Sequence, residues 1–242
     1  MTKPKKTKRE NWFVLYFVKY VLGITMMLYF KTKYYYEKRR IKVNNKIKTI
    51  KSNRRIKGRA VLIVNHIGFL DPLVLEMAFL NRILRFVVNK EVLESNKLLG
   101  WILPRLGCIE VRKGTPDASF IKRCLTILKK DQVLAIFPEG HISLNHELDQ
   151  FKKGAVVFAL KTKSPIIPTY IGGKYGLFKR QKLVVGLPIN PYDYVKGEKY
   201  TDQEVEYINN LIHQKTNELK RIIELGKWSP RLKRCKKRKI MP

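Results

Sequence analysis

A histidine and an aspartate five positions apart, His66 and Asp71, have the residue types and spacing for acid–base chemistry. His66 follows the apolar run 60–64, which is typical of a short buried strand. Asp71 precedes Pro72, a pair that predicts the N-cap and first position of a helix. A loop between strand and helix can fold back, so that the carboxylate fixes the imidazole tautomer and leaves the other ring nitrogen as a base. The plainer alternative is that Asp71 is only a helix cap and His66 only a polar loop residue.

A second polar loop follows another apolar run, where residues 133–137 lead into Pro138, Glu139 and Gly140. Proline ends the strand, and glycine permits a tight turn, so Glu139 is left at the strand end. In open α/β sheets, ligands bind beyond the carboxyl ends of the strands. If the two strands run parallel, we expect His66 and Glu139 to lie at the same edge of the sheet.

From residue 60 onwards, short apolar runs alternate with amphipathic stretches, a pattern typical of an α/β domain with a largely parallel sheet flanked by helices. The expected strands are 60–64, 84–88, 107–111, 132–137, 165–171 and 182–186. The expected helices are 71–80, 95–103, 116–130, 154–162 and 203–225. Thr115 and Pro116 are expected as the N-cap and first position of the third helix. The last helix is expected to cover the sheet.

The stretch 12–30 is apolar apart from one interior lysine. As a helix it would be roughly 28 Å long, just enough to cross the hydrocarbon core of a membrane. Its aromatic ends favour a membrane-embedded segment over a signal peptide or a buried core helix, and whether it spans the membrane or dips in and returns stays open. We therefore expect a basic membrane-anchoring segment 1–59, an α/β domain 60–226 and a basic tail 227–242.

The charge balance is extreme, because 51 basic and 19 acidic residues give a formal net charge of +32 over 242 residues. Such a chain suits anionic membranes, nucleic acid or acidic ligands, and the basic flank of the apolar stretch suits lipid headgroups. Three widely spaced cysteines favour a reducing compartment over a disulfide framework. Neither these cysteines nor the four histidines show the spacing of zinc ligands.

Several stretches resemble the motifs of the glycerolipid acyltransferase family, the 1-acylglycerol-3-phosphate acyltransferases and their relatives, and they occur in the same order as those motifs. The matching residues are Asn65-His66 to Asp71 for N-H-x4-D, 106–114 for the motif whose arginine holds the acceptor phosphate, Phe137 to Gly140 for F-P-E-G, and 151–155 and 164–168 for the later F-x-x-G and apolar-proline motifs. The resemblance runs from about Gly58 to Pro188, which is most of the expected α/β domain.

The resemblance implies an enzyme that moves a fatty acyl group from a thioester to the free hydroxyl of lysophosphatidic acid, giving phosphatidic acid in phospholipid synthesis. The expected site residues are His66 as general base with Asp71 orienting it, and Asn65, Arg112, Lys113, Glu139 and Gly140 as substrate-binding residues. We expect no bound cofactor or metal, and acyl-coenzyme A or acyl-acyl carrier protein as co-substrate. The expected partners are anionic membrane lipids, the lysophospholipid acceptor and acyl carrier protein, but not nucleic acid. The expected location is the membrane, with the catalytic domain on the cytoplasmic side.

Two positions depart from the family pattern. F-P-E-G usually continues with threonine and arginine, where this chain has His141 and Ile142. The phosphate-binding arginine position, counted from Gly107, is Lys113, with Arg112 one residue earlier; lysine supplies charge without the planar guanidinium fork. The runner-up hypothesis is therefore an acyltransferase with a different lysolipid acceptor. A basic nucleic-acid-binding protein and a non-catalytic membrane scaffold are the alternatives from other classes, and product formation would exclude both.

Overall fold

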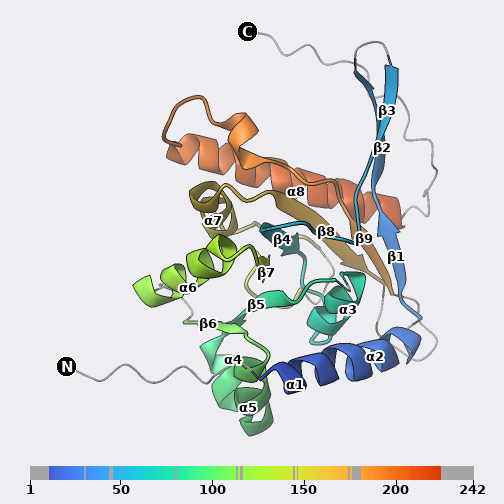
Figure 1. Cartoon of the computed structure of the whole chain (residues 1–242), viewed down its shortest axis with the longest axis vertical. Coiled ribbons are helices and arrows are strands. Elements are labelled where there is room, and N and C mark those ends of the chain that lie inside the picture. The colour runs from blue at the N-terminus through green and yellow to red at the C-terminus, as the bar shows by residue number, and fades with distance from the viewer. Residues whose placement is uncertain are drawn as a thin grey trace.

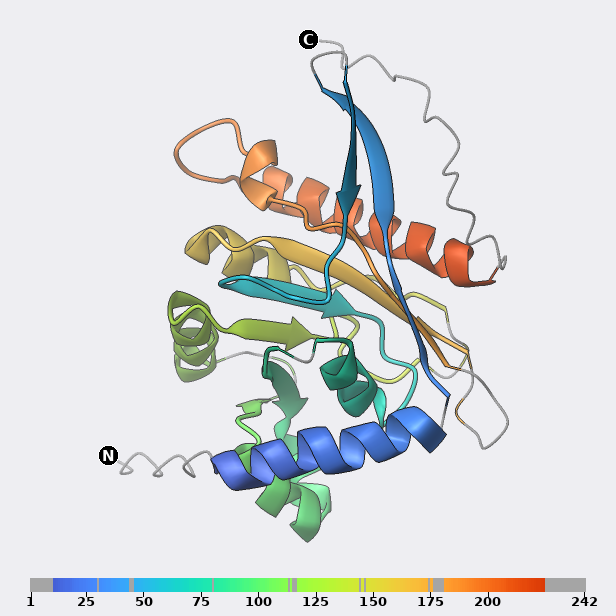
Figure 2. The same cartoon turned by 45° about the vertical axis from the view of Figure 1, so that its right-hand side comes forward.

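A seven-stranded sheet forms the centre of the protein, and the computed structural model describes residues 11–29, 31–43, 46–79, 81–112, 114, 117–143, 145, 147–173, 175 and 181–224. The strand order is β1-β9-β8-β4-β7-β5-β6 (Figure 1). These strands are β1 (Lys33–Tyr36), β4 (Ala60–Val64), β5 (Leu84–Asn89), β6 (Ile109–Val111), β7 (Val133–Ile136), β8 (Ile166–Gly172) and β9 (Lys182–Val185). A separate antiparallel ribbon, β2 (Lys38–Val43) with β3 (Lys46–Lys51), extends away from the sheet (Figure 2).

Helices cover both faces of the sheet. The described helices are α1 (Trp12–Tyr16), α2 (Gly23–Tyr29), α3 (Asp71–Ala78), α4 (Lys90–Ser95), α5 (Lys97–Arg105), α6 (Ala118–Lys129), α7 (Gly154–Thr162) and α8 (Asp202–Glu224), with a π-helical turn η1 (Phe17–Leu22) and a 3-10 turn η2 (Pro191–Tyr194). Val61 and Ile63 of β4 pack with α6, α7 and α8, while Leu62 and Val64 pack with α3 on the other face. Alternate side chains of a strand point to opposite faces, so burial on both sides explains why β4 is apolar throughout.

β4 lies in the middle of the sheet and runs parallel to both of its neighbours, β7 and β8. β5 and β6 continue in the same direction, whereas β9 is antiparallel to β8. The expected largely parallel α/β fold is therefore confirmed. Because β4 and β7 are parallel, the loops that carry His66 and Glu139 both leave from the same edge, as predicted.

The predicted strands and helices between residues 60 and 224 are present, with ends that agree within two residues. Both predicted N-caps differ from the structure. The side chain of Asp117 caps α6 by accepting from the Phe120 N–H, and Thr115 and Pro116 lie outside the described residues. Leu70, not Asp71, is the N-cap of α3, because the Asp71 carboxylate turns back to the loop before the helix.

The expected division at residues 59 and 60 does not follow the fold. β1 pairs in parallel with β9 and forms one edge of the main sheet. Tyrosines of β1 also reach α3, where the Tyr34 and Tyr36 hydroxyls donate to the carbonyls of Val74 and Ala78. Part of the segment 1–59 is therefore built into the α/β domain, while the predicted tail 227–242 lies outside the described residues.

Residues 12–29 of the apolar stretch expected at 12–30 form one N-terminal helix made of α1, η1 and α2, which lies across the domain beside α3 (Figures 1 and 2). Its inner face buries Leu15 and Val18, and Gly23 lies against the Met77 side chain. Its outer face exposes large apolar side chains. Within the described residues, no helix is both long enough and apolar enough to cross a membrane.

Lys19, the single interior lysine of this stretch, joins the N-terminal helix to α3 and the residues after it through hydrogen bonds. Lys19 is only 3% exposed, and its ammonium donates to Glu76 Oε2 at 2.6 Å and to the Phe79 carbonyl at 3.1 Å. It also donates to the carbonyl of Arg82. The two carbonyls lie at and just beyond the C-terminal end of α3, where a cation is favoured by the helix dipole.

Candidate active site

The centre of the site is the contact between His66, just past β4, and Asp71, the first residue of α3. His66 Nδ1 lies 2.8 Å from Asp71 Oδ2, and the imidazole stacks on the Phe137 ring at 4.1 Å between centroids. An ionised carboxylate takes its hydrogen bond from Nδ1–H, which leaves the lone pair on Nε2. Among the described residues nothing bonds to Nε2, and the side chain is 18% exposed. The imidazole is thus oriented and has one nitrogen ready to take a proton.

The Asp71 carboxylate is fully buried and accepts four hydrogen bonds. Oδ2 accepts from His66 and from the backbone N–H groups of Ile67 at 2.7 Å and Gly68 at 2.9 Å. Oδ1 accepts from the Tyr175 hydroxyl. A buried carboxylate is tolerated when its lone pairs are satisfied in this way, and four donors also prevent its rotation. The Asp71 carboxylate is therefore held in the orientation in which Oδ2 accepts from His66 Nδ1.

Tyr175 is a site residue that sequence reasoning missed. It follows β8, and its ring packs on Gly68, where a Cβ would come within 2.5 Å of the ring. Burial, together with the neighbouring Asp71 carboxylate, raises the pKa of Tyr175 above its usual value, so the hydroxyl remains a donor. A single tyrosine 104 positions after Asp71 carries no spacing signal. The only indication in the sequence was that Tyr175 follows the expected strand 165–171. The carboxyl end of that strand lies at the same edge of the sheet as His66.

The Asn65 side chain joins two strand ends, and its expected role in substrate binding stays a prediction. Its side-chain Nδ2 donates to the Ile171 carbonyl at 2.9 Å, and its Oδ1 accepts from the Ile171 N–H at 2.7 Å. Both contacts are buried and join the end of β4 to the end of β8. Because both polar atoms are engaged by backbone, Asn65 fixes the start of the loop that carries His66.

Glu139 is brought to the same edge as His66, as expected, but its carboxylate is not solvated. The residue is 4% exposed, and among the described residues neither carboxylate oxygen has a hydrogen-bond partner. Burial, followed by the nearby Asp149 carboxylate, raises the pKa of Glu139 to about 7. His141 and the backbone N–H groups of Asp149 and His66 act in the opposite direction.

The turn at Gly140 lies directly under a lysine ammonium. Gly140 has a φ of 78°, a left-handed conformation that glycine adopts without strain. A Cβ at this position would come within 2.6 Å of Lys152 Nζ. Neighbouring Lys153 forms an ion pair with Glu206 at 3.2 Å, whereas no ion pair to Lys152 occurs within the described part of the chain. Lys152 therefore supplies a positive charge beside the Glu139–Gly140 turn.

Of the two predicted phosphate-binding residues, Arg112 lies to the side of His66 and not next to it. Arg112 is exposed and follows β6, the outermost strand, which is three strands away from β4. Strands lie about 4.8 Å apart, so Arg112 starts roughly 14 Å to the side of His66. Lys113 lies outside the described residues. Arg112 shares the edge with His66 but is not gathered into its immediate neighbourhood.

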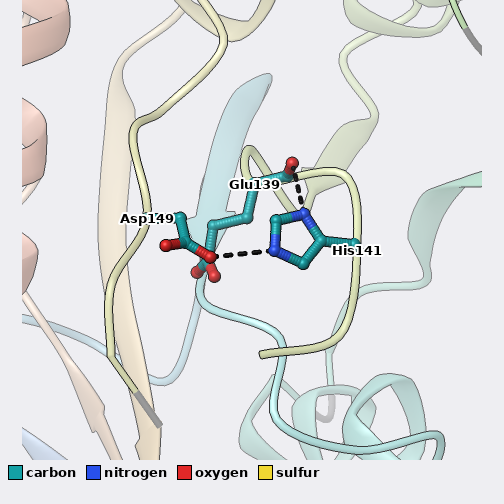
Figure 3. A group of neighbouring side chains, drawn as sticks. All are labelled: Glu139, His141 and Asp149. Atoms are coloured by element: carbon teal, nitrogen blue, oxygen red, sulfur yellow. Dashed lines mark hydrogen bonds and ion pairs between the residues drawn. The ribbon is translucent and has the colours of Figure 1, made fainter. Parts of the chain in front are cut away.

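One group of side chains in the described residues has the composition of a metal site. It consists of Glu139, His141 and Asp149, whose nearest ligand atoms all lie within 4.8 Å of one another (Figure 3). His141 Nε2 lies 2.8 Å from Asp149 Oδ2, and His141 Nδ1 lies 3.2 Å from the Glu139 carbonyl oxygen. The Ser143 N–H donates to the His66 carbonyl at 2.7 Å, so this loop is joined to His66.

An apolar cavity of about 80 Å³ lies beneath the N-terminal helix. It extends from α3 across β5 to α5, and Pro72 and Leu73, directly after Asp71, form part of its wall. The other apolar lining residues are Leu15, Val18, Ile83, Leu84, Phe86, Val88, Leu103, Leu106 and Cys108. The cavity therefore connects the outer helix with the segment that begins at Asp71.

Comparisons with known proteins agree with the geometry. The 1-acyl-sn-glycerol-3-phosphate acyltransferase of Bacillus subtilis (strain 168) is 29% identical over 166 residues, which cover 66% of this chain and 82% of that protein. The enzyme of the same name from Streptococcus pneumoniae is 30% identical over 156 residues, covering 63% of this chain and 57% of that protein. The crystal structure of the 1-acyl-sn-glycerophosphate (LPA) acyltransferase PlsC from Thermotoga maritima has the same fold, with a TM-score of 0.58 at 19% identity over 90% of this chain and 82% of that one.

The family itself is shown by a match that covers more than half of the sequence. The protein-family model described as Acyltransferase matches residues 40–172, which include both His66 and Asp71 and extend to the end of β8. The chain belongs to the acyltransferase family and is an O-acyltransferase.

Proposed function

We propose that this chain is a membrane-bound 1-acylglycerol-3-phosphate O-acyltransferase, which moves a fatty acyl group from a thioester to lysophosphatidic acid and gives phosphatidic acid. The observation that carries the proposal is the 2.8 Å contact between His66 Nδ1 and Asp71 Oδ2 in a chain of the acyltransferase family. The names of the similar curated proteins support the acceptor. The donor in this proposal is acyl-coenzyme A or acyl-acyl carrier protein.

In the proposed reaction, His66 Nε2 takes the proton of the acceptor hydroxyl while the oxygen attacks the thioester carbonyl. Asp71 holds the tautomer and stabilises the imidazolium that forms. When the tetrahedral intermediate collapses, the thiolate leaves and takes the proton from His66. Tyr175 acts through Asp71, whose second oxygen it holds. The donor arrives with an activated carbonyl, so these residues supply only proton transfer and orientation.

Lys152 is our proposed contact for the acceptor phosphate. It supplies a charge near the position where Ile142 replaces the arginine usual in this family, and its ammonium lies over the Gly140 turn. Lys153 is the natural control, because it is adjacent in sequence but pairs with Glu206. Arg112 is the second candidate, and it would contact the phosphate only if the acceptor extends toward β6.

The membrane contact in this proposal is the outer face of the N-terminal helix, not a membrane-spanning segment. Its exposed large apolar residues are Trp12, Phe13, Tyr16, Phe17, Tyr20, Val21, Leu22, Ile24, Leu28 and Tyr29. A helix with one apolar face exposed and the other bound to the protein can lie in the membrane interface, and the basic chain suits the anionic cytoplasmic leaflet. The cavity beneath this helix would accept the end of an acyl chain entering from the lipid.

The test of the function is product formation by membranes that contain the protein, with a panel of lysolipids and both acyl carriers. We expect phosphatidic acid to form from lysophosphatidic acid. A clear preference for another lysolipid would instead support the alternative acceptor suggested by His141 and Ile142, and no acyl transfer to any lysolipid would overturn the proposal.

The phosphate contact is tested by comparing Lys152→Ala with Lys153→Ala. Loss of a hydrogen bond to a charged group removes about 1.5–3 kcal/mol of binding, so Lys152→Ala should raise KM for the acceptor roughly 10- to 100-fold and leave KM for the donor unchanged. Lys153→Ala should change both values less than about threefold. Equal effects of the two substitutions would place the phosphate elsewhere, with Arg112→Ala as the next variant.

A further inference from the structure

We propose that Glu139, His141 and Asp149 form a binding site for a divalent cation of the zinc type beside the catalytic histidine (Figure 3). The site does not depend on the proposed substrate. It lies in the loop after β7, at the position where this chain has histidine in place of the threonine usual for its family.

The first argument is the hydrogen-bonding position of His141. Its Nδ1 faces the Glu139 carbonyl oxygen at 3.2 Å and its Nε2 faces an Asp149 carboxylate oxygen at 2.8 Å, so both ring nitrogens face acceptors. A neutral imidazole has one N–H and can satisfy only one of them. With the proton on Nδ1, the Nε2 lone pair points at the carboxylate, and a cation between the two relieves that repulsion. A ring N–H donated to a backbone carbonyl is also the usual arrangement for a histidine that binds a metal.

The second argument is the carboxylate of Glu139. It is more than nine-tenths buried, and within the described residues neither oxygen has a hydrogen-bond partner of good geometry, although the nearby backbone N–H groups of Asp149 and His66 partly offset the cost of its burial. Figure 3 shows this carboxylate directed toward the Asp149 oxygen that faces His141. An unpaired buried carboxylate is costly, and two carboxylates close together add repulsion. A divalent cation held between Glu139, Asp149 and His141 Nε2 would compensate both.

The donor set indicates the class of cation. Zinc binds both imidazole nitrogen and carboxylate oxygen and accepts water at a further position, whereas calcium and magnesium prefer shells made of oxygen, so the imidazole of His141 favours a cation of the zinc type. The ligand atoms lie within 4.8 Å of one another, and two ligands of a tetrahedral zinc are roughly 3.3 Å apart. Binding would therefore need only small shifts, in which His141 Nε2 and Asp149 Oδ2 move apart from 2.8 Å and Glu139 moves closer to them. The His141 and Asp149 side chains are about half exposed, which leaves the cation a path from solvent.

The consequence of binding would be structural. The loop between His141 and Asp149 is joined to His66 through the bond from the Ser143 N–H to the His66 carbonyl. A cation shared by Glu139, His141 and Asp149 would hold both ends of that loop together. It would thereby steady the backbone next to the catalytic base without taking part in acyl transfer.

The test is a calorimetric Zn²⁺ titration of the full chain, solubilised in detergent, without an affinity tag and stripped of metal by a chelator. We expect the wild type to bind one equivalent more tightly than His141→Ala and Asp149→Asn do, by at least about tenfold. Asp131→Asn is the matched control, because Asp131 is an exposed carboxylate before β7, at the opposite end of that strand. Its zinc affinity should equal that of the wild type.

Thermal unfolding gives a second readout that does not involve acyl transfer. Zn²⁺ should raise the Tm of the wild type and of Asp131→Asn but not that of His141→Ala or Asp149→Asn, while all four proteins should unfold at similar temperatures without metal. Equal zinc affinity in wild type and His141→Ala, or no binding by the wild type, would overturn the proposal. In that case the hydrogen bond between His141 and Asp149 alone would account for the geometry.

Discussion

The buried Lys19 ammonium joins the N-terminal helix to α3, and Lys19→Met removes that charge while keeping most of the side-chain volume. Lys19 is 3% exposed and has three acceptors, of which the Glu76 carboxylate lies at 2.6 Å. Removing one partner of a buried ion pair leaves the other charge uncompensated and costs about 3–5 kcal/mol. For a chain of this size, that loss should lower Tm by roughly 6–20 °C.

Two controls isolate the charge pair. Lys19→Met combined with Glu76→Gln removes both charges, and the amide oxygen can still accept from the Leu84 N–H that Glu76 Oε1 now binds at 2.8 Å. The double variant should therefore recover about half or more of the lost stability. Lys90→Met removes a partly exposed lysine paired with Glu94 four residues on, and the substitution should lower the free energy of unfolding by less than about 0.5 kcal/mol.

The pH dependence of Lys19→Met gives a further check. Burial raises the pKa of Glu76, and Lys19 opposes that rise. Without Lys19, the folded protein should bind a proton at Glu76 at higher pH than the unfolded chain does, so the stability deficit should shrink as the pH falls from about 8 toward 5. The measurement is thermal unfolding of both proteins across this range. A Lys19→Met protein as stable as wild type at every pH would refute the view that Lys19 fastens the N-terminal helix.

Three further outcomes follow from the site and the N-terminal helix. Asp71→Asn should lower kcat steeply, by about 10⁴-fold at the extreme, because asparagine cannot stabilise the imidazolium; near-normal turnover would reduce Asp71 to a structural role. Tyr175→Phe should lower kcat about 10- to 100-fold with little change in KM, whereas unchanged kcat would show that Asp71 needs no further support. The wild type should stay with membranes in high salt, which screens charge but not apolar burial. Phe13→Asp with Phe17→Asp should be released, and retention of that variant would contradict membrane contact through this face.

The α/β architecture could be predicted because its strands are buried on both faces and its helices are amphipathic, so each leaves a strong periodic pattern. The His66–Asp71 contact could also be foreseen, since both residues flank one short loop. The sequence predicted that Asp71 contacts His66, but it wrongly predicted Asp71 as the N-cap of α3. A cap and a loop-directed carboxylate look alike in sequence, and the backbone N–H groups of Ile67 and Gly68 take the place of the helix amides.

The features that escaped prediction depend on residues far apart or without a spacing rule. Lys19 looked like an interruption in a membrane segment, because its partner Glu76 lies 57 positions away. Tyr175 meets Asp71 only because β8 ends beside β4. His141 and Asp149 are eight positions apart, which matches no established metal-ligand spacing, and they meet only because the chain after Gly140 folds back on itself.

The most direct test of the catalytic account is phosphatidic acid formation by wild type and His66→Ala, measured with lysophosphatidic acid and an acyl thioester at equal protein content. The side chain of His66 lies at the end of β4 and is partly exposed, so the variant should fold, with a Tm close to that of the wild type. Loss of the general base should lower the rate by about 10²–10⁴-fold. A folded His66→Ala protein that forms phosphatidic acid within tenfold of the wild-type rate would contradict the assignment of His66 as the base.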